Sequence, residues 1–247
     1  MDFHQASKPF SIKKRSDVGI LVIHGFTSTV SSVYPLGEYL ARHNINVEAP
    51  CLSGHGKTWK ELNRISCGDW IRDVEKALRK LKKRALKIFV SGLSLGGTLA
   101  LYLAEQHPEL KGVILINHGL FIKDWRKIFL PFLRFILRST TPIRADIKDP
   151  SKQEIAYDRT PVKGAYELSK LYRMVRKNLK KVKAPVLIFK SRHDHVIGRK
   201  DVFFTLKNIS SLLQQIFWLE NSYHVATVDH DRDVICKMSL RFINQNL

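Results

Sequence analysis

Cysteine is scarce in this chain of 247 residues, and so are acidic residues and long apolar runs. The three cysteines, Cys51, Cys67 and Cys236, are odd in number, and none belongs to a C-x-x-C pair. This spacing indicates neither a disulfide framework nor a zinc site. We expect three reduced, buried thiols.

No run of residues approaches the roughly 20 apolar side chains that a membrane-spanning helix needs. The first 17 residues carry an acid at position 2 and contain no apolar core of the kind found in secretory signals. We therefore expect a soluble, cytoplasmic protein.

Acidic residues number 22 against 42 lysines and arginines, which gives a formal net charge of +20 at pH 7. A surface this basic attracts polyanions such as nucleic acid or anionic lipid. No nucleic-acid-binding motif accompanies the charge, so we expect no specific nucleic-acid partner. The charge is concentrated in residues 118–184, whose 17 Lys plus Arg and 6 Asp plus Glu give a net charge of +11.

What the chain does contain is a regular alternation of short apolar runs with longer segments whose apolar residues recur at helical spacing. This alternation predicts an α/β fold: a mostly parallel central sheet with helices on both faces, in one domain spanning residues 1–247. The expected strands are residues 19–24, 46–49, 87–91, 112–117, 185–190 and 214–219. The expected helices are residues 34–43, 70–83 (with Asp69 as N-cap), 95–106 and 231–245.

Residues 118–184 interrupt the alternation, because roughly 65 residues separate two expected strands there. We expect this insertion to form a small helical cap over the sheet. Its helices would lie in residues 123–138 and 166–182, with Pro131 breaking the first of them. That first segment mixes large apolar and basic side chains, which suits either the wall of an acyl pocket or an anionic membrane surface.

The strongest functional signal is G-x-S-x-G at residues 92–96, between an apolar strand and a helix. A tight strand-to-helix turn holds one residue in strained geometry with its side chain projecting, and the flanking glycines leave room for the crossing of strand and helix. Ser94 would be that residue. The helix start also offers free backbone N–H groups and a positive dipole end to an oxyanion.

A serine hydroxyl needs a histidine as base and a carboxylate that orients the histidine. In such sheets these groups follow in the order Ser, Asp, His. Asp194 lies in the polar loop after the strand at 185–190, and His224 lies in the loop between the strand at 214–219 and the last helix. We predict Ser94, Asp194 and His224 as the catalytic triad.

Other histidines and acids lie near both positions. His193 and His195 flank Asp194, but both precede the last strand. Asp229 and Asp231 follow His224, and we expect them to cap the N-terminus of the last helix. Asp229 is the first alternative acid to test.

The loop after the first strand, His24-Gly25-Phe26-Thr27, predicts the rest of the reaction centre. We expect the backbone N–H groups of Phe26 and Leu95 to form an oxyanion hole, and Gly25 to allow close backbone approach. We interpret His24 and the G-H-G turn at residues 54–56 as structural parts of the loops rather than participants.

With these residues assigned, the whole chain resembles the bacterial carboxylesterase and monoacylglycerol lipase family of the α/β-hydrolase superfamily. The segments that carry the resemblance are HGFT at 24–27, GHG at 54–56, GLSLGG at 92–97, RHDHVI at 192–197 and NSYHVATVDHD at 221–231. The resemblance implies an oxyanion hole at the residues matching Phe26 and Leu95. Through residues 141–150 and 152–161 it further implies that Glu154 accepts hydrogen bonds from glycerol hydroxyls, with the Ile143 backbone nearby.

We therefore expect a serine hydrolase that cleaves carboxylic esters, such as monoacylglycerols or short to medium chain acyl esters, through an acyl-enzyme on Ser94. No metal or organic cofactor is implied. Two alternatives stay open: a thioesterase or other acyl hydrolase on the same fold, and a catalytically silent lipid-binding protein.

Overall fold

A seven-stranded sheet forms the centre of the molecule, in the order β1-β3-β2-β4-β5-β8-β9. The computed structural model describes residues 3–123, 128–142 and 146–247. The strands of this sheet are β1 (Phe10–Ile12), β2 (Val18–Ile23), β3 (Asn46–Ala49), β4 (Lys87–Leu93), β5 (Gly112–Ile116), β8 (Val186–Ser191) and β9 (Gln214–Leu219).

All pairings in this sheet are parallel except that of β1 with β3, where Phe10 lies opposite Ala49. The predicted α/β fold with a mostly parallel sheet is therefore confirmed. Each of the predicted strands is present, with bounds that differ by two residues or fewer. β1 was not predicted, because its three residues are too short a run to show a strand pattern.

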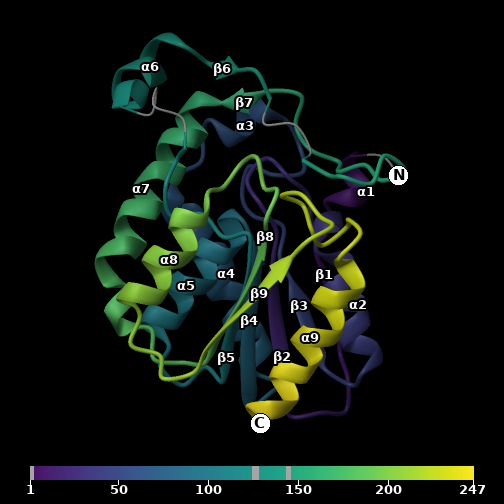
Figure 1. Cartoon of the computed structure of the whole chain (residues 1–247). Coiled ribbons are helices and arrows are strands. Elements are labelled where there is room, and N and C mark those ends of the chain that lie inside the picture. The colour runs from purple at the N-terminus through teal and green to yellow at the C-terminus, as the bar shows by residue number, and fades with distance from the viewer. Residues whose placement is uncertain (1–2, 124–127, 143–145) are drawn as a thin grey trace.

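Helices cover both faces of the sheet (Figure 1). One face carries α2 (Tyr34–Arg42) and α9 (Arg232–Gln245). The other carries α4 (Cys67–Lys82), α5 (Leu95–Gln106), α7 (Val162–Asn178) and α8 (Arg199–Asn208). Shorter pieces are α1 (Phe3–Ala6), α3 (Trp59–Leu62) and the 3₁₀ turns Val30–Ser32 and Leu179–Lys181. Two apolar cores result, one on each face, which explains why strands such as β2 are buried on both sides.

The start of α4 differs from the prediction. The helix begins at Cys67 rather than at residue 70, and Ser66 rather than Asp69 is its N-cap residue. Asp69 lies in the first turn, where its carboxylate accepts the backbone N–H of Ser66 at 2.8 Å. This is a capping box, in which a side chain of the first helical turn accepts the backbone N–H of the N-cap residue.

The first part of the predicted insertion lies above the carboxyl ends of the strands, where Figure 1 shows α6 and the strands β6 and β7, whereas its second part, α7, covers a face of the sheet. The first part contains α6 (Leu130–Ile136) and the antiparallel pair β6 (Ser139–Thr140) and β7 (Thr160–Pro161), and it leads into α7. α7 packs against α5 and extends the core with Leu171 and Val175.

Two expectations about the insertion change. In the described part of the first predicted helix, which leaves out residues 124–127, Pro131 lies in the first turn of α6, where its fixed φ fits and its missing N–H costs no hydrogen bond. The second helix runs from Val162 to Asn178, so it starts and ends four residues before the predicted range of 166–182. Within the described residues, no helix is long and apolar enough to cross a membrane.

Candidate active site

Ser94 is the single residue between β4 and α5. Its φ of 54° lies in the left-handed region, which is strained for a residue with a side chain. The Ser94 backbone N–H donates to the Ile116 carbonyl at 3.0 Å, which fixes the turn against the neighbouring strand β5. The hydroxyl is therefore presented at the carboxyl edge of the sheet.

The two glycines of the motif are required by close contacts. A Cβ on Gly92 would lie 2.1 Å from the carbonyl carbon of Gly96, and a Cβ on Gly96 would lie 2.1 Å from the carbonyl oxygen of Ile23. Because these neighbours are backbone atoms, they cannot move aside. The strand-to-helix turn thus has the geometry that G-x-S-x-G predicts.

Asp194 and His224 lie together in the loops after β8 and β9. Both carboxylate oxygens of Asp194 lie 3.1 Å from His224 Nδ1, and Asp194 Oδ1 also accepts the backbone N–H groups of Val196 and Ile197 at 2.9 Å. Burial disfavours the charged carboxylate, but the His224 imidazole and the Lys190 ammonium hold the pKa of Asp194 well below its usual range. An ionised Asp194 therefore faces the imidazole.

Ser94 and His224 line the same cavity, which has a volume of about 860 Å³. Among the described residues, no hydrogen bond joins the Ser94 hydroxyl to the His224 ring. Hydrogen bonds of this kind often tighten only when substrate binds. Other residues around the cavity include Gly25, Phe26, Ser28, Phe121, Leu130, Leu133, Glu154, Leu168, Tyr172 and Val225.

The carboxylates of the competing acids, Asp229 and Asp231, are occupied elsewhere. The Asp229 carboxylate accepts backbone N–H groups of Lys148, Asp149 and Tyr223 at 2.8 to 3.0 Å. Asp231 is the N-cap residue of α9 but makes no side-chain capping bond; it accepts the Asn221 N–H instead. Asp231 thus lies at the helix start as expected, but the expected capping by the two carboxylates is not seen among the described residues, because both carboxylates bind loop backbone.

His24 is buried and holds two loops together. Its Nε2 accepts the Leu52 N–H at 3.1 Å, so Nδ1 carries the proton and donates to the Gly25 carbonyl at 2.9 Å. Burial lowers the pKa of His24 to about 4, which keeps the ring neutral. His55 of the G-H-G turn likewise accepts the Thr27 N–H at 3.2 Å. These are the structural roles expected of both histidines.

The backbone N–H groups of Phe26 and Leu95 flank Ser94 from different elements. Leu95 is the first residue of α5, and Phe26 lies in the loop after β2. Neither N–H donates a hydrogen bond to any residue that the structure describes. The Phe26 ring packs edge-on against Trp70, with ring centroids 6.0 Å apart, and this contact fixes the loop.

Glu154, which belongs to the insertion, lines the cavity. Burial raises the pKa of its carboxyl group, while the neighbouring Ser28 hydroxyl and the His224 imidazole act in the opposite direction. Ile143 lies outside the described residues.

Sequence reasoning missed two residues beside the site. Asp146 of the insertion binds both the His195 and the His224 backbone N–H groups through its carboxylate, at 3.0 and 3.2 Å. Lys190 is a buried lysine in β8 that contacts Asp194. The role of Lys190 could have been suspected from the sequence. A lysine inside the apolar run V-L-I-F-K-S of a central strand is buried and therefore needs a charged partner.

The parallel sheet, the strained serine turn and the Asp194–His224 pair define a serine hydrolase of the α/β-hydrolase class. Comparison with known proteins gives the narrower assignment. Residues 14–231 match the family described as "Serine aminopeptidase, S33", and the chain belongs to this family.

Individual relatives agree with that assignment. The chain is 39% identical to the thermostable monoacylglycerol lipase of Bacillus sp. (strain H-257), covering 96% of this chain and 94% of the relative. It is 28% identical to a carboxylesterase of Bacillus subtilis (strain 168), with 96% of each covered. A solved structure from a study of the metagenome-derived lipolytic enzymes LipS and LipT superposes with a TM-score of 0.94 at 36% identity, covering 97% of this chain and 98% of that one. The expected carboxylesterase and monoacylglycerol lipase family, and an enzyme that hydrolyses esters, are confirmed.

Proposed function

We propose that this enzyme hydrolyses monoacylglycerols, with Ser94, Asp194 and His224 as its triad. The observation that carries the proposal is that Ser94, His224 and the carboxylate of Glu154 line one cavity whose remaining wall is largely apolar. An acyl chain fits the apolar part, and a polyhydroxy leaving group fits the carboxylate. The similarity to a monoacylglycerol lipase over nearly the whole chain supports the same substrate class.

The reaction proceeds in two acyl transfers. The Ser94 oxygen attacks the ester carbonyl carbon while its proton moves to His224 Nε2, and Asp194 holds Nδ1 and offsets the imidazolium charge. When the tetrahedral intermediate collapses, the alcohol leaves with the proton from His224. Water, activated by the same histidine, then releases the acid and regenerates Ser94.

The oxyanion is stabilised by the N–H groups of Phe26 and Leu95. Their lack of other hydrogen-bond acceptors among the described residues leaves them available to the developing charge. The N-terminus of α5, a helix of 12 residues, adds the positive end of its dipole. Removal of one such donor costs about 2.7 to 4 kcal/mol in comparable enzymes.

Glu154 binds the alcohol part of the substrate. An ionised carboxylate accepts hydrogen bonds from the two free hydroxyls of a monoacylglycerol. The cap in residues 118–184 thereby selects the leaving group, while Ser94 and the sheet supply the chemistry.

The substrate proposal is tested with ester pairs of matched acyl chain. We expect kcat/KM for a monoacylglycerol to exceed that for the methyl ester of the same acid by about 10-fold or more, because only the former presents hydroxyls to Glu154. Equal values would identify a general carboxylesterase. A preference for the corresponding acyl thioester would identify the enzyme as a thioesterase.

A second proposal concerns α6, whose apolar side chains point in two directions. Leu130 and Leu133 line the cavity, whereas Phe132, Phe135 and Ile136 are 70%, 74% and 77% exposed. We infer that these three residues insert into the acyl boundary of an anionic bilayer. The Arg134 guanidinium lies over the Phe135 ring at 4.5 Å, which places a cation beside the apolar surface. Trp125, Arg126 and Lys127 of the same predicted segment lie outside the described residues.

A further inference from the structure

Lys190 is one of the most deeply buried side chains in the protein, with 1% of its surface exposed. Lysine is almost never buried to this degree without a charged partner. Its Nζ donates to Asp194 Oδ2 at 2.5 Å and to the Ile197 carbonyl at 2.8 Å. The partner of this lysine is therefore the carboxylate that orients His224.

Asp194 consequently has two cationic neighbours during the proposed reaction. Oδ2 is shared by Lys190 and His224, and Oδ1 accepts backbone N–H groups of the same loop. In the usual triad the carboxylate faces the imidazole as an uncompensated anion and stabilises the imidazolium. Here part of that negative charge is already neutralised before His224 takes up a proton.

We propose that Lys190 is a positioning residue that sets the pH range in which His224 acts as a base. By binding Asp194, the ammonium group makes protonation of His224 less favourable and so extends activity toward acidic pH. Its second hydrogen bond, to Ile197, holds the turn in which Asp194 lies. The inference rests on the triad proposed above.

Other charged groups surround this chain of contacts. Asp201, Arg199 and His118 face Lys190. Burial lowers the pKa of Lys190 most, Asp201 raises it and Arg199 lowers it. Glu154 faces His224 from the insertion. All of these groups remain when Lys190 alone is replaced, so a difference between variant and wild type reports the lysine.

The alternative is a buried ion pair that only stabilises the fold. Removing one partner of such a pair is destabilising, because it leaves an uncompensated charge. That role predicts a lower unfolding temperature and a lower rate at every pH. A shift of the pH profile along the pH axis is expected only when the charge acts on His224.

The experiment measures the rate at which a fluorophosphonate labels Ser94, and kcat/KM for an ester, from pH 4 to 9. The variants are Lys190→Met, Lys190→Gln and Lys190→Arg. We expect the acid limb of both uncharged variants to move up by about one to two pH units, from the loss of a unit charge near the imidazole at an effective dielectric constant of about 20. At pH values below the midpoint, the rates of these variants should be about 10- to 100-fold lower than those of the wild type. Their rates on the plateau should stay within about 10-fold of the wild-type rates. Lys190→Arg should keep the wild-type midpoint.

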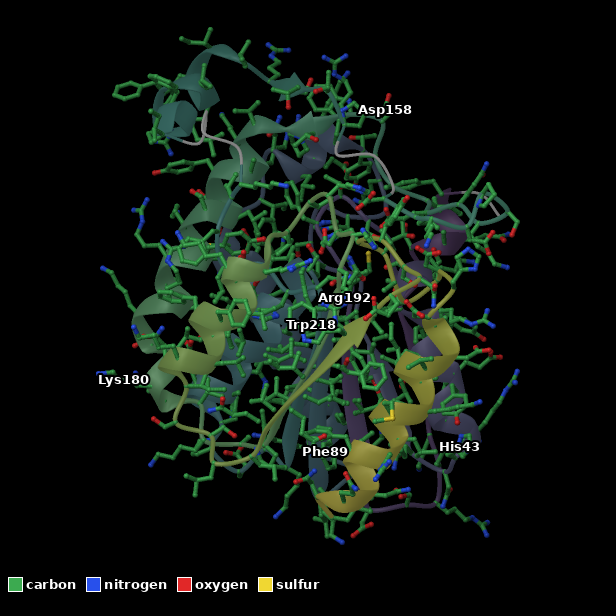
Figure 2. The ribbon with its side chains drawn as sticks, in the orientation of Figure 1. His43, Phe89, Asp158, Lys180, Arg192 and Trp218 are labelled. Atoms are coloured by element: carbon green, nitrogen blue, oxygen red, sulfur yellow. The ribbon has the colours of Figure 1, made fainter. Side chains whose placement is uncertain are left out.

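Arg192→Gln is the matched control, because it removes one positive charge two residues after Lys190, in the loop that carries Asp194. The Arg192 guanidinium pairs with Glu220 at 2.6 Å and lies over the Trp218 ring, and Figure 2 labels both Arg192 and Trp218. Its acid limb should coincide with that of the wild type.

Unshifted limbs in folded Lys190→Met and Lys190→Gln proteins would overturn the inference. So would the failure of every uncharged variant to fold, since the lysine would then be a structural counter-ion. Failure of the proposed function looks different: the wild type itself would not be labelled at Ser94 and would not cleave esters.

Discussion

The Asp146 carboxylate accepts the backbone N–H of His224 at 3.2 Å, so a residue of the insertion holds the loop that carries the proposed base. The same carboxylate binds the His195 ring at 2.7 Å, and the Asp146 carbonyl accepts the Val225 N–H at 3.0 Å. The insertion and the loops after β8 and β9 are thereby joined at one residue.

The first prediction follows from this contact. Asp146→Ala leaves two backbone N–H groups without an acceptor, so the His224 loop should loosen and kcat should fall about 10-fold, with a loss of roughly 1 to 3 kcal/mol in unfolding free energy. Steady-state kinetics and thermal denaturation measure both. The control is Asp158→Ala, an exposed acid of the insertion; equal effects of the two variants would contradict a specific role for Asp146.

Ser94→Ala should reduce kcat on the order of 10⁶-fold while leaving the far-UV circular dichroism and the unfolding temperature close to those of the wild type. Asp194→Asn should lose roughly 10⁴-fold, because the amide favours the wrong histidine tautomer. Steady-state ester hydrolysis by the purified variants, together with circular dichroism and thermal denaturation, checks both. A folded Ser94→Ala protein that kept a tenth of the activity would refute the nucleophile assignment.

Glu154→Gln should lower kcat/KM for monoacylglycerols by about 10- to 150-fold and hardly change it for p-nitrophenyl esters. A hydrogen bond to a charged acceptor contributes about 1.5 to 3 kcal/mol, and only the glycerol moiety forms it. The ratio of the two substrates, measured on the same protein preparation, is the readout. Equal losses on both substrates would mean that Glu154 supports the cap and does not bind glycerol.

The exposed side of α6 should bind anionic vesicles. Ser94→Ala protein is expected to co-sediment with phosphatidylglycerol-containing liposomes at low salt and to be released as salt rises, because each basic residue near the surface contributes about 1 kcal/mol. Adding Phe132→Ser and Phe135→Ser should abolish sedimentation. Phe203→Ser, at another exposed aromatic residue on α8, is the control. No sedimentation of the parent protein would refute surface binding.

Glu105 gives a prediction about stability and pH. Both of its carboxylate oxygens are buried without a hydrogen-bond partner among the described residues, and burial, opposed by Lys181, raises its pKa to about 8. The folded state thus binds this proton more tightly than the unfolded state does. The contribution of protonated Glu105 to the free energy of unfolding is full below about pH 4.5, the ordinary pKa of the group. It is lost as the pH rises through about 8, the pKa in the folded state.

Glu105→Gln, which stays neutral, should therefore stabilise the protein by on the order of 2 to 4 kcal/mol at pH 9 and have little effect at pH 4.5. Denaturant unfolding at both pH values tests this. The control is Glu109→Gln, whose carboxylate pairs with Lys82 at 2.6 Å, and this variant should not be stabilised at pH 9. A pH-independent difference between wild type and Glu105→Gln would contradict it.

The sequence predicted the regular parts of the fold because strands such as β4 and helices such as α5 have continuous or periodic apolar residues. It also predicted the Asp194–His224 contact, since the order of strands places their loops at one edge. α8 was missed because its residues, Arg199–Asn208, mix polar and apolar types with weak periodicity. Asp146 could not have been found, because its role depends on where the insertion folds back, 78 residues from His224 in the chain.

The path of the chain after β5 affects how the inserted segment can vary in evolution. The excursion that holds α6, β6 and β7 leaves the carboxyl end of β5 and rejoins α7 at the same edge, so α7 alone makes the ordinary crossover to β8 (Figure 1). Insertions, deletions or replacements between residues 122 and 160 need not alter the strand order or the serine turn. Substrate choice can therefore be exchanged or engineered as a module, provided that the replacement keeps an acceptor such as Asp146 for the loop that carries His224.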